Sequence, residues 1–520
     1  MVSVTMSFQL PDNMPELNLR APSERGKSSG IELNDSLLSH WIKRLPQHDL
    51  LSYTETYLET IKKFNRNDIN HKLRLHMLDF YRQPLNSLLF SLTIPKLADS
   101  VASSKTRLQI ITNLAELMDE LAMGYKIVIN DANDNSANLK LNIMAQLAIN
   151  RASEQLSYMA LHAYKFYQVV PIRVFKELHQ LYQLALHANV VDKIPSMNKQ
   201  QRALFSLHHR YSQILLVSIC NPYGLESGKV LEAYFMMDKL VSTADIWPLP
   251  DNHQATSGHF FINCLSDRTP TPTVLPTIEN QIQPPTLIFD TKPVLNLADT
   301  LFQQSESSNV SINLELFKQL VPFLNTSYQR KQERLPLSGD EHAFLAFGLA
   351  DIHHCLHHIH QPNNDNNNAT WQILNKNNYG YLIKRQHVSA CHDLKIGDFV
   401  GIFEQQSNQQ KSPPKLASIK WLRTDHNNVT KIGLETLDRE VIALHFSLQE
   451  NGPIYPALLL PEVGQQLHAA SIITAPGRVK PQQTLYIKTK KKRFNFTIQA
   501  SQLIDNNENF ERFTFIDILD

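Results

Sequence analysis

The sequence predicts a multidomain α and β protein, in which an N-terminal all-α helical domain precedes an antiparallel β-barrel and a second small C-terminal β domain. Three observations lead to this fold class. The length of 520 residues exceeds what one ordinary core organises. Apolar residues recur at helical spacing through the first part of the chain. After Trp371 that period gives way to short apolar runs separated by turn residues.

The helical domain begins after a polar N-terminus. Residues 1–33 are rich in polar and turn-forming residues, so we expect them to be disordered. Residues 34–243 carry apolar side chains at helical spacing, as Leu38, Trp41 and Ile42 illustrate. Prolines and asparagine-rich joints divide this region, which predicts an all-α domain of about eight helices.

Residues 244–310 differ in composition from the domain before them. Seven prolines fall between positions 248 and 285, among many threonines, glutamines and asparagines. We expect a Pro/Thr-rich linker or bridge, because proline interrupts both helices and sheet ladders. Within it, only His259–Leu265 has the apolar content of a strand.

Two β regions follow. Residues 311–447 begin with a helix, continue with short β-type segments that fit a small barrel, and include a helical insertion near 351–360. Residues 453–520 alternate apolar and polar side chains and predict a second small β domain. One face of each sheet needs a cover, so we expect the second domain to pack against or beside the first.

Composition narrows the class of protein. The formal charge is +1, which argues against nucleic-acid binding, and we interpret the basic run Lys488–Arg493 as a solvated hairpin turn. We expect no membrane span, because no apolar run of about 18 residues occurs. The four cysteines are far apart in sequence, which favours a reducing compartment, and the expected localisation is cytoplasmic.

The chain is not expected to be an enzyme, because it lacks the common nucleotide-cradling, nucleophile and zinc-protease motifs. A histidine-rich segment, His353–His360, raises the question of a metal site, since His353 and His357 are four residues apart. A site needs a third ligand that this segment does not name, so we expect a half-buried helix with polar histidines and no metal.

The most specific chemical signal is a split pair of motifs. Arg330 and Arg334 stand four residues apart, and Asn375, Asn377 and Gly380 follow as Asn-x-Asn-x-x-Gly. Guanidinium groups bind phosphates and the guanine edge through paired hydrogen bonds, and they also stack on purines. Asparagine offers both a donor and an acceptor, and glycine lets the backbone approach a ligand closely.

These motifs resemble the signature of PilZ domains, Arg-x-x-x-Arg followed by Asp/Asn-x-Ser-x-x-Gly. Leu394–Val400, Ile419–Arg423 and Lys431–Glu435 resemble further strands of that barrel, in the family's order. The resemblance implies a PilZ-like barrel over 311–447 that binds cyclic di-GMP, with the arginines clasping the ligand and the second motif forming its floor. It also implies a cytoplasmic signalling receptor without a cofactor, whose helical domain contacts an unidentified protein partner.

Two departures from the family pattern motivate an alternative. Asn377 stands where the family has Ser, and 40 residues separate Arg334 from Asn375, more than in the family. The alternative is an adaptor or scaffold protein that binds no ligand and carries a degenerate PilZ barrel. In that case the two motifs do not converge.

Overall fold

The computed structural model divides the chain into two compact units, Met1–Gln329 and Arg330–Asp520. The residues that the structure describes are 4–6, 19–21, 26, 34–101, 103–132, 141–250, 254, 256–273, 286–304, 313–326, 335–336, 341–357, 370–386, 394–405, 414–437, 440–462, 469–488, 495–507 and 509–518. Among the described helices, none is both long and apolar enough to cross a bilayer.

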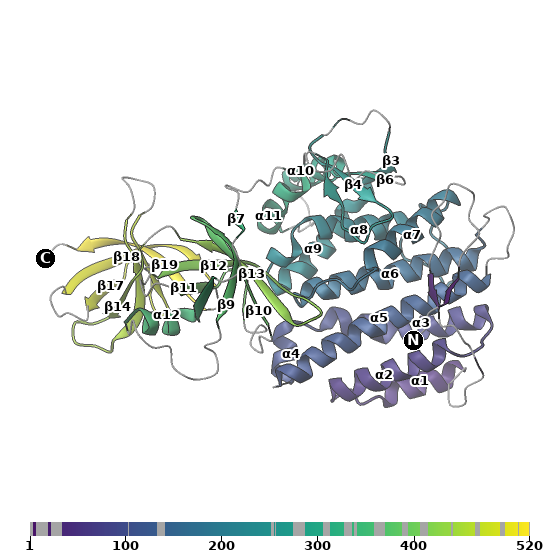
Figure 1. The fold of residues 1–520 in the computed structure, drawn as a ribbon, viewed down its shortest axis with the longest axis horizontal. Helices are drawn as coiled ribbons and strands as arrows, with labels where there is room; N and C mark the ends of the chain where they lie inside the picture. The colour runs from purple at the N-terminus through teal and green to yellow at the C-terminus, as the bar shows by residue number, and fades with distance from the viewer. Residues whose placement is uncertain are drawn as a thin grey trace. The chain divides into compact units, whose positions relative to one another are not determined.

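The first unit is built mainly from helices that pack side by side (Figure 1). Its first nine α-helices are α1 Asp35–Arg44, α2 Leu50–Asn65, α3 His71–Ser91, α4 Ile94–Ser100, α5 Ser104–Ala132, α6 Ile143–Lys165, α7 Val174–His187, α8 Leu207–Ile219 and α9 Ser227–Leu240. Polar side chains cap many of their N-termini: Asn34, Asp49, Asn70, Thr93, Asn142 and Ser206 each accept a backbone N–H hydrogen bond. The predicted all-α domain is confirmed.

Helix α6 forms the centre of this unit. Nearly all of its residues from Ala145 to Lys165 are buried, and α5 packs along it. A helix buried on every side must satisfy its polar side chains within the protein. His162 Nε2 donates to the Ile111 carbonyl over 2.9 Å, and Asn150 donates to the Phe205 carbonyl over 2.9 Å.

Charged residues on α6 join a buried ionic network. Glu154 is 2% exposed and lies 2.9 Å from Arg82 and 3.3 Å from Arg210. Arg151, on the same helix, lies 3.3 Å from Asp79 and 3.6 Å from Glu154. Burial works to raise the pKa of Glu154, but the three arginines outweigh it and lower that pKa. The network ties α6 to α3 and α8.

The segment expected to be a linker, 244–310, is instead part of the first unit. Its described residues form strands β3 Asp245–Pro248, β4 His259–Asn263, β5 Thr271–Pro272 and β6 Thr286–Asp290, in the sheet order β3-β6-β4-β5, and helix α10 Lys292–Gln304. Phe260 and Phe289 are buried in the core that the helices share. Proline misled the prediction because Pro248 and Pro272 lie on the two edge strands, where a missing N–H is tolerated.

Two further boundaries differ from the expectation. Within 1–33, strands β1 Val4–Met6 and β2 Leu19–Ala21 pair antiparallel, and Gly26 bridges Asn67, so these described residues are not disordered. Helix α11, Leu314–Leu324, belongs to the first unit rather than to the barrel. Its apolar face packs in the helical core, which the sequence period alone does not reveal.

The second unit contains two closed antiparallel barrels, which confirms the predicted β fold class. The first comprises β8 His342–Phe347, β9 Trp371–Asn377, β10 Gly380–Gln386, β11 Phe399–Gln405, β12 Lys415–Thr424 and β13 Val429–Thr436. The second comprises β14 Ile442–Ser447, β15 Tyr455–Leu460, β16 Ser471–Thr474, β17 Thr484–Lys488, β18 Asn495–Asn506 and β19 Glu511–Ile518. Strand β14 therefore belongs to the second barrel, although the sequence assigned it to the first.

Helix α12, Gly348–His357, follows β8 and packs on strands of both barrels (Figure 1). Ile352 of this helix is 1% exposed within an apolar cluster that includes Phe399 from the first barrel and Leu458 and Ile473 from the second. Burying such side chains contributes about 1.5–3 kcal/mol each. Of the basic run Lys488–Arg493, only Lys488 is among the described residues, at the end of β17.

We predict that Glu154→Ala strongly destabilises the helical unit. The change leaves Arg82, Arg151 and Arg210 without their shared carboxylate in a buried site, which costs about 3–5 kcal/mol. Chemical denaturation followed by the helical circular dichroism signal measures the effect. As the matched control, Glu116→Ala removes an exposed ion pair with Lys62 and costs less than about 1 kcal/mol. Equal losses for the two variants would contradict the prediction.

We also predict that stability declines as pH falls below the ordinary histidine pKa of 6.5. Burial lowers the pKa of His162 to about 3 and that of His179 to about 4. The unfolded chain then binds protons that the folded chain does not, so the free energy of unfolding is highest above pH 6.5 and falls toward acid. Each histidine contributes about 1.4 kcal/mol per pH unit between these values.

Urea unfolding at several pH values between about 7 and 5 tests this slope. In His179→Gln one of the two buried imidazoles is absent, so the slope becomes shallower even though the variant loses hydrogen bonds to Tyr211 and to the Arg268 carbonyl. An unchanged slope in His179→Gln would refute the assignment.

Candidate functional site

The second half of the split motif forms the tight hairpin between β9 and β10. Asn377 pairs with Gly380 across a two-residue turn, and Asn377 Oδ1 accepts the Tyr379 N–H over 3.0 Å. Thr436 on β13 holds the turn, donating its N–H to the Tyr379 carbonyl and its hydroxyl to the Asn378 carbonyl. Asn377 thus has a turn-forming role, and these hydrogen bonds fix the position of the hairpin.

A bulge in β9 decides which way the motif faces. Leu382 pairs with Asn375 and the next residue, Ile383, pairs with Ile373, so Leu374 is an extra residue. Ile373 and Ile383 are fully buried in the barrel, whereas Asn375 lies on the opposite, outer side of the sheet. Strict alternation would have placed Asn375 on the same face as Ile373.

The strand that follows the arginine motif lies beside the asparagines. β7, Leu335–Pro336, pairs antiparallel with β9, and its register sets Leu335 opposite Lys376 and Pro336 opposite Asn375. Arg330 and Arg334 themselves lie outside the described residues. Arg334 directly precedes Leu335, and Arg330 lies at most about 18 Å of extended chain before it. The register of β7 against β9 thus places the chain that directly follows Arg334 beside Asn375.

Asn375 carries a polar atom that lacks a partner. Its Oδ1 is buried and accepts no hydrogen bond from the described residues. Such a group costs free energy in a protein interior. Gly380 is buried, but it is not among the described glycines with positive φ. Its backbone conformation therefore does not require glycine.

A second bulge turns Trp421 to the same outer face. Lys420 is the extra residue in β12, because Ile419 pairs with Leu434 and Trp421 pairs with Gly433. A Cβ atom on Gly433 would lie 2.0 Å from the Trp421 indole nitrogen, so the indole lies directly over this glycine. The pairings place Pro336, Asn375, Leu382, Gly433 and Trp421 in one row across five strands.

The neighbouring outer row is basic. Lys384 on β10 pairs with Lys431 on β13, and Lys431 pairs with Arg423 on β12. Like charges directly opposite one another on adjacent strands are unfavourable. An anion bound against this row would lower the repulsion between these cations. The outer face thus presents an amide, an indole and three cations.

On the inner side of the barrel, an ionic network near the hairpin links β9, β10, β11 and β12. Lys376 Nζ lies 2.9 Å from Glu404, and the Tyr381 hydroxyl donates to the same carboxylate. Burial alone would raise the pKa of Glu404, but the hydrogen bonds from Lys376 and Tyr381 lower it. Lys415 donates to the Tyr381 hydroxyl over 3.0 Å. The network positions β9 and β10 from inside.

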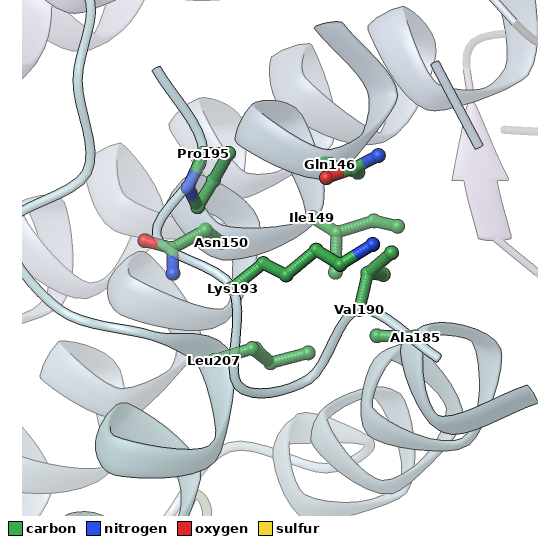
Figure 2. Close-up of a pocket in the computed structure, with 8 residues that line it drawn as sticks. All are labelled: Gln146, Ile149, Asn150, Ala185, Val190, Lys193, Pro195 and Leu207. Carbon is green, nitrogen blue, oxygen red and sulfur yellow. The ribbon is translucent and has the colours of Figure 1, made fainter. Parts of the chain in front are cut away.

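A cavity of the first unit offers no competing ligand site. Gln146, Asn150, Lys193 and Pro195 are among the residues that line it (Figure 2). It has room for about one water molecule. A nucleotide does not fit there.

Four outer-face residues were not predicted as site residues from the sequence: Lys384, Arg423, Lys431 and Trp421. Three of them fall inside the fragments that resemble the PilZ barrel, so the sequence did indicate the strands on which they lie. The signal was incomplete because the bulge at Lys420 changes which side of β12 faces outward.

Comparisons with known proteins agree with this architecture. The family model "Cyclic-di-GMP receptor FimW, N-terminal domain" matches residues 36–249, and "FimW C-terminal beta-barrel domain" matches residues 442–518. The second match begins at β14, where the second barrel begins. Together the two models cover more than half of the chain, with the first barrel lying between them.

A curated relative, the cyclic-di-GMP receptor FimW of Pseudomonas aeruginosa, is 26% identical over 183 residues. The alignment covers 35% of this chain and 30% of that protein, so the chain spans less than a third of the relative's length. No solved structure matches the chain. Because it carries both the N-terminal domain and the C-terminal barrel domain of the FimW receptors, in that order, the chain belongs to the FimW family.

Proposed function

We propose that this protein is a cytoplasmic cyclic di-GMP receptor of the PilZ type, and that the outer face of its first barrel binds the ligand. The observation that carries the proposal is the pairing of β7 with β9. It brings the chain that follows Arg334 against Asn375, so both halves of the motif can reach one ligand. The name of the Pseudomonas aeruginosa relative, a cyclic-di-GMP receptor, supports the same ligand.

Each group on the outer face suits part of a cyclic dinucleotide. Arg330 and Arg334 fork onto phosphate oxygens or onto the O6/N7 edge of guanine. Asn375 presents a buried amide oxygen that lacks a partner and can accept from a guanine N–H. The Trp421 indole offers a flat surface for a purine ring. Gly380 keeps the start of β10 without a side chain beside Asn377.

The basic row supplies the charge. The ligand carries two phosphates, and Lys384, Lys431 and Arg423 stand side by side next to the row of Asn375 and Trp421. Charge-assisted contacts of this kind strengthen binding and attract an anionic ligand over a distance. We assign the three cations to phosphate binding.

Ligand binding would act at the junction of the two units. The arginine segment begins where the second unit begins, at Arg330. Clasping the ligand would hold the arginines against the outer face of the barrel and so change how the helical domain is presented to an unidentified protein partner. The chain would signal through this shift in population, and no catalytic step is involved.

We predict that Arg330→Ala/Arg334→Ala abolishes measurable cyclic di-GMP binding and that Asn375→Ala weakens it about tenfold. Charged hydrogen bonds contribute about 1.5–3 kcal/mol each, and a single amide contributes about half of that. Calorimetry on the full chain measures the affinities. Asn375→Ala should not lower thermal stability, because the buried oxygen that it removes lacks a partner in the folded protein.

Matched controls separate ligand recognition from general charge. Arg478→Ala removes an exposed arginine of the second barrel and should bind like the wild type. Cyclic di-AMP offers the same phosphates with a different base edge and should bind more weakly. If wild-type protein produces no heat with cyclic di-GMP, the proposal fails and the adaptor alternative takes its place.

We predict that Trp421→Ala weakens cyclic di-GMP binding by about 5–150-fold, whereas Trp421→Phe retains most of the affinity. Stacking of a base on an aromatic ring contributes about 1–3 kcal/mol. Tryptophan fluorescence reports the contact, since ligand should quench the wild type and not Trp421→Phe. Quenching that persists in Trp421→Phe would place the stacked base elsewhere.

A further inference from the structure

Three histidines from two parts of the second unit meet at one place. His353 and His357 lie one helical turn apart on α12, and His445 lies on β14 of the second barrel. The sequence argued against a metal because the histidine-rich segment names no third ligand beside this pair. The fold brings that third ligand from the first strand of the second barrel.

The ring nitrogens are close enough to share one ion. Nε2 of His357 lies 3.1 Å from Nε2 of His353, and one ring nitrogen from each of the three histidines lies within 4.8 Å of the others. Two nitrogens on one tetrahedral zinc ion are about 3.3 Å apart. The first pair already has ligand spacing, and His445 has to move by at most about 1.5 Å.

Packing holds the three rings near these positions. His353 is 7% exposed, and its Nε2 lies 2.9 Å from the Leu444 carbonyl oxygen. The His357 ring stacks on the His445 ring with centroids 5.3 Å apart, and His353 meets His445 edge-on with centroids 4.5 Å apart. Preorganised ligands lose little freedom when they bind an ion. Coordination through Nε2 of His353 exchanges the Leu444 hydrogen bond for a metal bond.

The donor set indicates the class of ion. Among the described residues, the cluster contains three imidazoles and no carboxylate or thiolate. Imidazole suits zinc, copper and nickel, whereas magnesium and calcium take oxygen ligands. We propose that His353, His357 and His445 bind one divalent transition-metal ion of the zinc class, with its fourth position left to water or another ligand.

An ion at this place would join the two barrels. Helix α12 packs on β8 and β11 of the first barrel and on β14 and β15 of the second. Coordination by α12 and β14 would add a cross-link to the apolar cluster around Ile352. The site uses none of the strands that carry Asn375 or Trp421, so it stands independently of the proposed nucleotide site.

The test uses the full-length chain without a histidine tag, stripped of metal by a chelator. Zn²⁺ is titrated by calorimetry, and Co²⁺ is titrated by visible absorption, which reports tetrahedral coordination by nitrogen. We expect one ion per chain, a tetrahedral cobalt spectrum and a Zn²⁺-dependent rise in the unfolding temperature. Wild-type protein that takes up neither ion at micromolar concentration overturns the proposal.

The decisive variant is His445→Phe, which keeps a ring stacked on His357 but removes its nitrogens. Its unfolding temperature should not rise with Zn²⁺, and it should bind Zn²⁺ more than about 100-fold more weakly, beyond the loss that an outer-shell change causes. The matched control is His354→Ala, which removes the histidine next to His353 on α12 that lies outside the cluster and should bind like the wild type. If His445→Phe retains wild-type affinity, the ion is bound elsewhere and this site is refuted.

Discussion

Pairing of β9 with β10 through a one-residue bulge is the constraint on which the first barrel and its outer face depend. The pairing closes the barrel, and the bulge at Leu374 lets Ile373 stay in the core while Asn375 turns outward. A matching bulge at Lys420 turns Trp421 to the same side. Because β-bulges change the direction of side chains locally, the extra residues Leu374 and Lys420 bring Asn375 and Trp421 to one outer face while the apolar side chains stay in the barrel core.

Strand β9 also lies beside the chain that follows the arginine motif. The residues between Arg334 and Asn375 include β7, β8 and α12, and β8 is itself a barrel strand. β7 pairs with β9 before β8 and α12 begin. The insertion places α12 on strands of both barrels, where its apolar face is buried and its histidines meet β14.

The helical unit follows a different physical logic. Its central helix α6 is buried on nearly every side, although it carries the charged residues Arg151 and Glu154. Buried charges destabilise a fold unless their partners are in place, so these residues admit few alternative packings. Asp79 on α3, Arg82 on α3 and Arg210 on α8 must meet them in one arrangement.

The order of the all-α and β regions follows from the sequence alone, because helical and alternating apolar periods are local properties of the chain. The sequence also predicted Arg330, Arg334, Asn375, Asn377 and Gly380 as site residues, because each half of the motif lies within a few residues of the chain. The sequence analysis misassigned 244–310 and β14. Whether a strand lies at the edge of a sheet, where proline is tolerated, and which barrel a strand joins depend on its neighbours in space.

Which residues face the candidate sites depends on long-range packing that the sequence pattern does not reveal. Bulges break the two-residue period, so no pattern along β9 or β12 reveals that Asn375 and Trp421 share a row. The basic row and the three-histidine cluster join residues that are distant in sequence. Long-range strand pairing and helix packing bring these groups together, and neither is encoded in the spacing of any single segment.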